Sequence, residues 1–152
     1  MTRIHTPRRA SQWLIAASLL LAGPVLGKPP SLPLQFLPAP ASHPGCSWLA
    51  RGFDYSVCIA PDRIHLHHAG RILSWSYASR SGTLRVEPAS PPLSSVNEFR
   101  GADPALWRSG IPAFGTLRIP DLYPGIDLVL SGADGRLKID YIVSPSASPS
   151  SI

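Results

Sequence analysis

The chain has 152 residues, among them 18 Pro, 12 Gly and 2 Cys, and only 15% of its residues are charged. This composition argues against a coiled coil, a helical bundle and a charged disordered tail, and it favours one small domain rich in strands and turns. The formal net charge is +5, and three of the basic residues lie within the first nine positions.

Residues 1–27 have the layout of a secretory signal peptide. Basic residues precede an apolar run from Trp13 to Leu26, and cleavage before Lys28 would follow Gly27. The run is interrupted by Gly23-Pro24 and is too short for a bilayer span, which takes about 20 residues. We therefore expect an exported protein of the periplasm, the outer cell surface or the medium, without a permanent membrane span. Because no Lys/Arg cluster remains after cleavage, we expect no nucleic-acid partner.

The two ends of the remaining chain have biased compositions. Residues 28–45 contain six Pro and predict an extended, polyproline-like lead-in. Residues 144–152 are rich in Ser and Pro, as linkers are. The β-rich domain is expected between them, at residues 46–143.

Cys46 and Cys58 predict a disulfide, because an exported chain with two Cys folds in an oxidising compartment. A three-residue loop over Arg51 to Phe53 would place the two Cys directly opposite each other. Two buried free thiols are the alternative. The chain contains no CxxC motif, and two Cys alone do not make a zinc site.

The central residues alternate with a period of two, which is typical of strands. Residues 63–68 alternate, Ala69-Gly70 can form a turn, and residues 71–77 return. A two-residue loop at that turn pairs Leu66 with Leu73, and Ile64 with Trp75.

A second hairpin is predicted from Ile126 to Val143, with its turn at Asp134-Gly135. This register gives each apolar residue an apolar partner on one face and leaves polar residues on the other. The pairs are Leu130 with Ile139, Leu128 with Tyr141, and Ile126 with Val143; the polar residues are Asp127, Lys138 and Asp140.

The remaining pattern completes an all-β prediction. A short helical turn is expected at residues 103–107, with Asp103 as N-cap and Pro104 in the first position. A type II turn is expected at residues 123–126. We predict an antiparallel, sandwich-like domain built from hairpins, with further strands at 46–51, 55–60, 83–87, 95–100 and 114–119.

His65 and His67 are the candidates for a metal site. They lie two apart on a predicted strand, so both project from one face, as paired ligands can. A solvated strand face explains the same alternation, and no third ligand is evident. We therefore expect no metal, and we keep a small secreted metal-dependent hydrolase at these residues as the alternative.

The sequence predicts no catalytic residue and no cofactor. It contains no GxSxG, GxGxxG, GxxxxGK or HExxH motif. The pairs Phe99-Arg100 and Trp107-Arg108 could form a stacking platform for a ligand, although aromatic residues more often belong to the core. Four carboxylates could suggest an acid/base pair or a calcium site, but no dense ligand loop is present: Asp121, Asp127, Asp134 and Asp140.

Several segments match a known family in order. The stretch Val96-Asn-Glu-Phe-Arg-Gly-Ala-Asp-Pro-Ala-Leu-Trp-Arg108 is followed by Leu122-Tyr-Pro-Gly-Ile-Asp-Leu-Val129 and then by Leu137-Lys-Ile-Asp-Tyr-Ile-Val143. Together with Leu32-Pro-Leu-Gln-Phe36 and Leu49-Ala-Arg-Gly-Phe-Asp-Tyr55, they resemble the N-terminal β-rich domain of bacterial cell-surface proteins that carry SBBP (β-propeller) repeats. The resemblance covers nearly the whole chain after the signal peptide.

The resemblance implies an exported, non-catalytic module with a structural or partner-binding role, whose partner is an unknown protein or a glycan at the surface. It implies structural roles for the motif residues, with Trp107 anchoring the short helical turn against the sheet. Its relatives continue into another strand and a propeller, so a truncated or degenerate fragment of a larger surface protein is a further alternative. The motif residues are Trp107, Tyr123, Pro124, Gly125 and Asp127.

Overall fold

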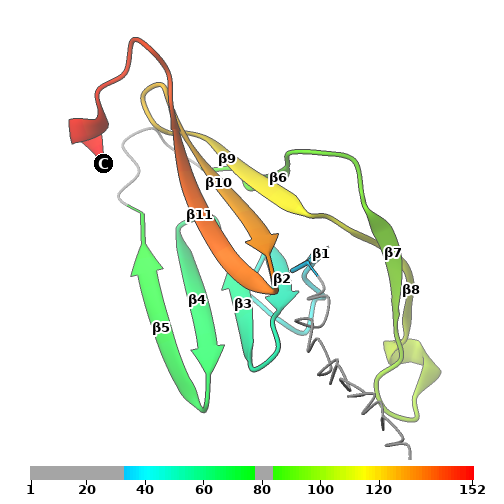
Figure 1. The fold of residues 1–152 in the computed structure, drawn as a ribbon. Coiled ribbons are helices and arrows are strands. Elements are labelled where there is room, and N and C mark those ends of the chain that lie inside the picture. Colours follow the sequence, from blue (N-terminus) through cyan, green and yellow to red (C-terminus); the bar gives the residue numbers. More distant parts are fainter. Residues whose placement is uncertain (1–32, 78–83) are drawn as a thin grey trace, which may run out of the picture.

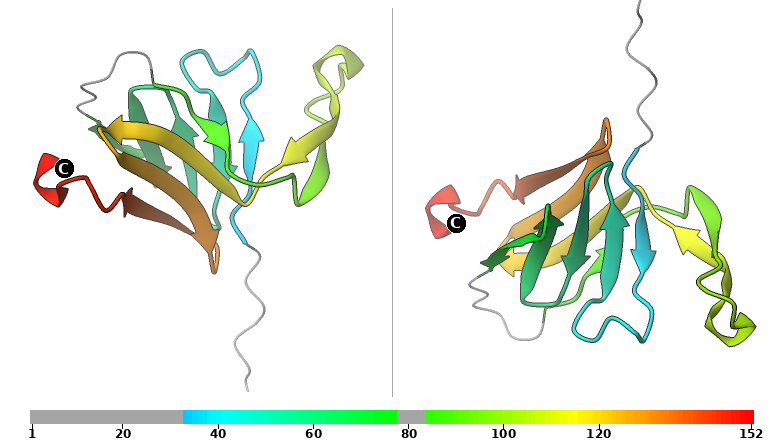
Figure 2. Two further views of the ribbon diagram at one scale, coloured as in Figure 1. Left: turned by 90° about the horizontal axis from the view of Figure 1, so that it is seen from above. Right: turned by 90° about the horizontal axis from the view of Figure 1, so that it is seen from below.

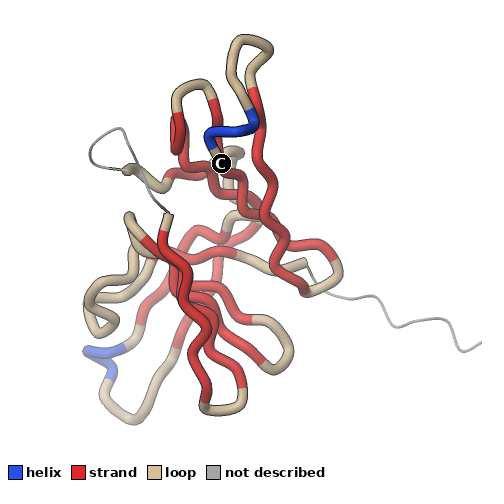
Figure 3. The backbone as a smooth tube through the Cα atoms, turned by 90° about the vertical axis from the view of Figure 1, so that its left-hand side faces the viewer, coloured by secondary structure: helices blue, strands red, loops and turns tan. Residues whose placement is uncertain are grey.

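The computed structural model describes residues 33–77 and 84–152. The predicted signal peptide, 1–27, lies outside this range. Strands make up most of the described chain (Figure 3), and they form two antiparallel sheets and a two-stranded arm. The predicted all-β, antiparallel fold is therefore confirmed. No helix of residues 33–77 and 84–152 is long and apolar enough to cross a bilayer.

The first sheet is a five-stranded meander in which each strand pairs with its neighbour in sequence (Figure 1). Its last hairpin has the predicted register, with Ile64 opposite Trp75 and Leu66 opposite Leu73. Ala69 has a φ of 48° and is followed by Gly70 at 74°, as a type I′ turn requires. The strands are β1 (Phe36–Pro38), β2 (Trp48–Arg51), β3 (Tyr55–Ile59), β4 (Arg63–His68) and β5 (Arg71–Ser76).

The second sheet has the order β11-β10-β9-β6 and packs face to face on the first (Figure 2). The predicted pairs of its long hairpin, Leu128 with Tyr141 among them, are all confirmed. Gly125 has a φ of 72°, which fits the predicted type II turn between β9 and β10. The strands are β6 (Glu87–Pro88), β9 (Thr116–Tyr123), β10 (Ile126–Ala133) and β11 (Arg136–Val143).

The arm extends away from the two packed sheets (Figure 2). It consists of β7 (Ser94–Glu98), the 3₁₀ turn η1 (Pro104–Leu106) and β8 (Arg108–Ala113). The Asp103 carboxylate accepts a hydrogen bond of 2.9 Å from the Ala105 amide, which confirms the predicted N-cap. At the base of the arm, paired backbone hydrogen bonds between Phe36 and Phe114 attach it to β1.

The inner faces of the two sheets form the hydrophobic core. Alternation along β10 turns Ile126, Leu128 and Leu130 inward, and all three are fully buried. Full burial of such a side chain contributes about 1.5–3 kcal/mol. The same core also contains Phe36, Val57, Ile59 and Ile64 of the first sheet and Leu117, Ile119 and Leu122 of β9.

Two strands were not predicted from the sequence. β1 lies in the Pro-rich segment, where Phe36 is fully buried in the core although a polyproline-like lead-in was expected. Pro38 is tolerated because it ends an edge strand. β8 contains Gly110 and Pro112, which read as strand breakers. Gly110 takes a φ of 66°, and its amide donates to the Asn97 side chain, at an irregularity in the β7–β8 register.

Gly132 permits a close contact between β10 and the residues that precede β1. Leu34, which precedes β1, packs directly on Gly132 of β10, where any Cβ would overlap the Leu34 side chain and backbone. Residues 144–147, which were predicted as part of a linker-like tail, fold onto the domain. The Ser144 amide donates to the Gly125 carbonyl over 2.9 Å, and Ala147 packs against the core.

Replacing Leu128 by Ala should lower the free energy of unfolding by about 2–5 kcal/mol, because it leaves a cavity between the sheets. Ile142→Ala, on the same hairpin, is the matched control, since Ile142 is 54% exposed and Leu128 only 1%. We expect this control to change stability by less than about 0.5–1 kcal/mol. Urea unfolding followed by circular dichroism measures both, and equal losses in the two variants would contradict the assigned inner face.

Tyr77 follows β5 and is buried, with its hydroxyl donating to the Ala60 carbonyl over 3.1 Å. Burial raises the pKa of this phenol above its ordinary value, and the charges of Asp62 and Tyr141 raise it further. The unfolded phenol ionises near pH 10 while the folded one resists ionisation. Its contribution to stability is therefore complete below about pH 10 and is lost as the pH rises further.

We expect Tyr77→Phe to cost about 0.5–1.5 kcal/mol at pH 7, through the lost hydrogen bond, and to flatten the decline in stability above pH 10. Tyr141→Phe, which removes a more exposed phenol, should keep the Tyr77 part of that decline. Urea midpoints at pH 7, 9 and 10.5 test this. An unchanged alkaline decline in Tyr77→Phe would show that another group causes it.

Candidate functional site

The outer face of the first sheet carries the two His residues singled out from the sequence. Because Ile64 points inward, the neighbouring positions 65 and 67 of β4 face outward together, as predicted. The His65 Nδ1 atom lies 2.6 Å from the Ser74 hydroxyl of β5. The ring centroids of His65 and His67 are 6.4 Å apart.

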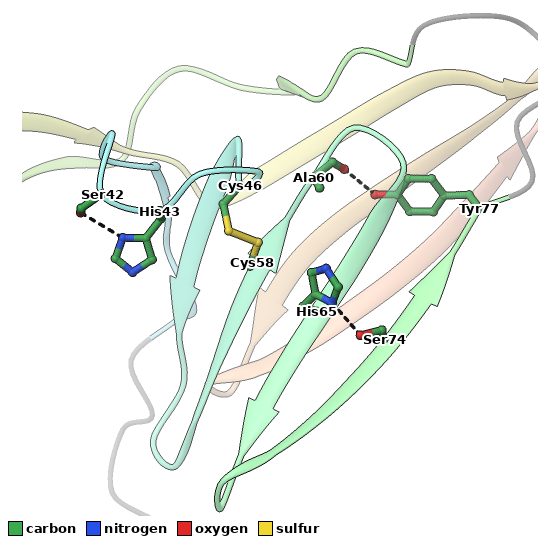
Figure 4. The surroundings of a disulfide bond; sticks show 8 residues. All are labelled: Ser42, His43, Cys46, Cys58, Ala60, His65, Ser74 and Tyr77. Atoms are coloured by element: carbon green, nitrogen blue, oxygen red, sulfur yellow. Dashed lines mark hydrogen bonds between the residues drawn. A yellow bond between two sulfur atoms is a disulfide. The ribbon is translucent and has the colours of Figure 1, made fainter.

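A disulfide joins Cys46 to Cys58 on this same face, beside His65 (Figure 4). The predicted bridge is confirmed, but the register argument used for it is wrong. Leu49, and not Cys46, stands opposite Cys58 on β2. Cys46 instead reaches Cys58 from the loop that precedes β2.

Tyr55 accounts for the difference in register between β2 and β3. Its hydroxyl donates to the Gly135 carbonyl over 2.8 Å and accepts from the Leu137 amide over 2.9 Å, which ties the start of β3 to the β10–β11 turn. Its ring lies over Gly52, where any Cβ would overlap it. The loop therefore closes with the Gly52 amide donating to the Tyr55 carbonyl, a pairing that the alternation of β3 alone does not reveal.

A shallow cavity of about 760 Å³ borders this part of the face. Its walls include Cys46, Cys58, His65 and His67, together with Ile72 of the edge strand β5. The described part of the chain contains no group of three or more His, Cys, Asp or Glu residues that could hold a metal. The sulfurs of Cys46 and Cys58 are bonded to each other.

The carboxylates considered in the sequence have structural contacts. One Asp127 oxygen lies 2.6 Å from Arg118 Nη2, and the other accepts from the Asp121 amide over 2.9 Å. Asp121 has a φ of 48° at an irregularity in the β9–β10 register, so Asp127 holds a bulge in place. Asp140 lies 3.0 Å from the Lys138 ammonium. Asp134 occupies the β10–β11 turn with a φ of 53°.

A second and more apolar cavity, of about 710 Å³, lies between the first two strands and the arm. We call it the arm groove and define it by Leu37, Leu49, Phe53, Val96 and Arg108. The Phe53 side chain is fully exposed at the tip of the β2–β3 loop. The groove thus combines an apolar lining with a protruding aromatic side chain.

Charged groups fix the arm beside the groove. Arg108 Nη2 donates to the Pro38 carbonyl of β1 over 3.0 Å. Arg108 and Arg100 both contact the carboxylate of Glu98, at 3.4 and 3.2 Å. Because Arg108 bonds to both β1 and β7, the groove has a fixed wall.

The arm tip differs from the expectation for its aromatic residues. Trp107 was expected to anchor the helical turn against the sheet, and Phe99 to belong to the core. Both are instead exposed, and their rings pack edge to face with centroids 5.3 Å apart. The indole N–H of Trp107 donates to the Gly101 carbonyl over 3.2 Å. The two rings stabilise the tip of the arm, far from the core.

A family model described as a domain of unknown function (DUF7948) matches residues 49–152. The chain belongs to the DUF7948 family. No curated protein matches the sequence, and no solved structure matches it. The DUF7948 match begins within β2, so it includes the arm, Cys58 and both His residues, but leaves out β1 and Cys46.

Sequence reasoning missed the arm groove, which combines residues of the DUF7948 match with residues of β1. Two of its walls come from β1 and β8. These strands were not predicted, because Pro and Gly residues interrupt their sequence pattern. The only available signal was Phe53, an aromatic residue next to the Gly and Asp of a hairpin loop.

Replacing both Cys46 and Cys58 by Ser should lower the free energy of unfolding by about 2–4 kcal/mol, because the unfolded chain loses its cross-link. Thermal unfolding of the variant and of the oxidised chain measures the difference. Alkylation followed by intact mass supplies the control. It should add two labels to the wild-type chain only after reduction, and labelling without reduction would contradict the bridge.

Proposed function

We propose that this chain is an exported, non-catalytic module of a bacterial surface protein, and that it binds a partner in the arm groove. The observation that carries the proposal is the groove itself, with its apolar lining and the exposed Phe53 beside it. Apolar surface concentrated in a concave site is typical of binding sites.

The groove chemistry suits an extended protein segment or a glycan. Leu37, Leu49 and Phe53 offer apolar and aromatic surface for a side chain or for the face of a sugar ring. Arg51, Glu98 and Arg108 at its border can orient polar groups. Because Arg108 also bonds to β1, little ordering of the arm is needed when a partner binds.

Two features support export. Residues 1–27 have the layout of a signal peptide. The Cys46–Cys58 disulfide fits an oxidising compartment.

We further propose that the chain corresponds to the N-terminal β-rich domain of SBBP-repeat surface proteins. The ordered segments 96–108, 122–129 and 137–143 support this assignment. A structural role for Tyr123, Gly125 and Asp127 agrees with it, because these residues form the β9–β10 turn and stabilise the adjacent bulge.

Non-catalytic action agrees with the contacts of the polar groups. Asp127 and Asp140, two of the carboxylates considered as an acid/base pair, each have a basic partner. A metal-dependent hydrolase at His65 and His67 is less supported, because no group of three possible metal ligands is found among the described residues.

Site-specific photo-crosslinking tests the proposal. A benzophenone amino acid replaces Phe53 in the full chain, expressed in its own bacterium, and the same substitution at Tyr141 is the control. Both side chains are aromatic and exposed, but Tyr141 lies on β11, outside the groove. We expect a light-dependent adduct from position 53 and none from position 141, with its identity read by mass spectrometry.

Arg108→Ala adds a second readout. This change releases the arm from Pro38 and should reduce the adduct from position 53. Equal adducts from positions 53 and 141, or none from 53, would overturn the binding role. Retention of the uncleaved chain in the cytoplasm would overturn the export.

A further inference from the structure

Four side chains with the chemistry of zinc ligands line one cavity on the outer face of the first sheet. They are Cys46, Cys58, His65 and His67. Two thiolates and two imidazoles form a common closed, tetrahedral zinc site in proteins. In the oxidised chain the sulfurs bond to each other and are not available as ligands.

The backbone already brings three of these residues together. Cys58 and His65 are direct cross-strand partners on β3 and β4, where Cβ atoms stand about 4.5–5.5 Å apart. The Cα atoms of Cys46 and Cys58 are 5.5 Å apart. Two sulfurs on one zinc ion stand about 3.8 Å apart, so rotation about the Cα–Cβ bonds can separate the reduced sulfurs sufficiently.

The fourth ligand comes from the next outward position of the same strand. His65 and His67 alternate with inward-facing residues, and their ring centroids are 6.4 Å apart. Two imidazoles on one zinc ion would stand about 5 Å apart between centroids, so a modest side-chain rotation is sufficient. His67 is exposed and therefore has room for this movement.

Ser74 prepares His65 for this role. In the tautomer whose Nδ1–H donates to the Ser74 hydroxyl, over 2.6 Å, the Nε2 lone pair is left for a metal. Such hydrogen bonds from the second ring nitrogen are typical of His ligands, because they fix the orientation of the ring.

We propose that reduction of the Cys46–Cys58 disulfide converts this face into a Cys₂His₂ zinc site with His65 and His67. A dithiol supplies two electrons and two protons: its own sulfurs form a disulfide, and the S–S bond of the chain becomes two thiols. Zinc binding then releases both thiol protons. The resulting site is neutral in charge, because two thiolates balance Zn²⁺.

The loop before β2 then has two alternative cross-links: the S–S bond joins it to β3, and the metal joins it to both β3 and β4. In an oxidising environment the link is the S–S bond, and in a reducing one it is the metal. Since all four ligands come from the protein, the zinc has no open position and its role is structural. The four ligand residues are not among those that line the arm groove. A negative result for the zinc site would therefore not affect the proposed binding role.

Cobalt titration of the purified chain tests the proposal. The chain is reduced with a phosphine under argon, and Co²⁺ is added as a spectroscopic substitute for zinc. We expect one equivalent to give a sulfur-to-cobalt charge-transfer band and the visible bands of tetrahedral cobalt, both of which Zn²⁺ removes. The oxidised chain should give neither.

Variants identify the ligands. His65→Ala and His67→Ala should each weaken the affinity by at least about tenfold. His68→Ala is the matched control: this residue is the next one on β4, but its Nδ1 contacts the Asp54 carbonyl instead of facing the cavity. The affinity of the His68→Ala variant for Co²⁺ should equal that of the wild type.

The possible contradictions are distinct. A reduced chain that stays folded by circular dichroism and gives no band would overturn the proposal. A band that is insensitive to both His65→Ala and His67→Ala would show binding by the thiols alone, and would also overturn it. If reduction unfolds the chain, Zn²⁺ must restore the native spectrum in the wild type but not in His65→Ala, and failure of that rescue counts against the site.

Discussion

Burial of two apolar sheet faces against each other is the constraint on which the rest of this structure depends. Strict alternation along β10 and β4 turns Leu128 and Ile64 into the interface. The same alternation turns His65 and Cys58 outward, since a side chain beside an inward one must face away. The packing of the inner face thus determines which candidate functional residues lie on the outer face.

The arm groove depends on a different set of contacts. Phe36 belongs to the core and also bridges to Phe114 at the base of the arm. Arg108 then holds the arm to β1 by donating to Pro38. The groove is therefore attached to the core through one short strand, although its own surface is exposed. A partner would meet a site whose walls are already in place.

The sequence predicts the local parts of this fold well. Type I′ turns at Ala69-Gly70 and Asp134-Gly135 fix the register of two hairpins, because a two-residue loop leaves only one pairing. The Cys46–Cys58 bridge was predictable because the chain has two Cys and a predicted signal peptide. Each of these features is determined by residues close together in the chain.

Non-local contacts account for what was missed. The β2–β3 register depends on Tyr55 bonding to the distant β10–β11 turn. β1 is a strand because Phe36 enters the core, in spite of its Pro-rich surroundings. Trp107 and Phe99 pack against each other on the arm. An alternating sequence pattern predicts strands, but it does not predict that two of them extend away from the sheets. The arm groove combines two such features and was therefore not predictable from periodicity.

The contact of Leu34 with Gly132 has a consequence for the order of folding during synthesis. Leu34 emerges from the ribosome early, but its packing surface exists only after residue 132 has been made. The meander β2 to β5 can pair locally, yet its inner residues, Val57 and Ile64, stay uncovered until β9 and β10 follow. The first half of the chain must therefore wait, with an apolar face open to water, for the second half to complete it.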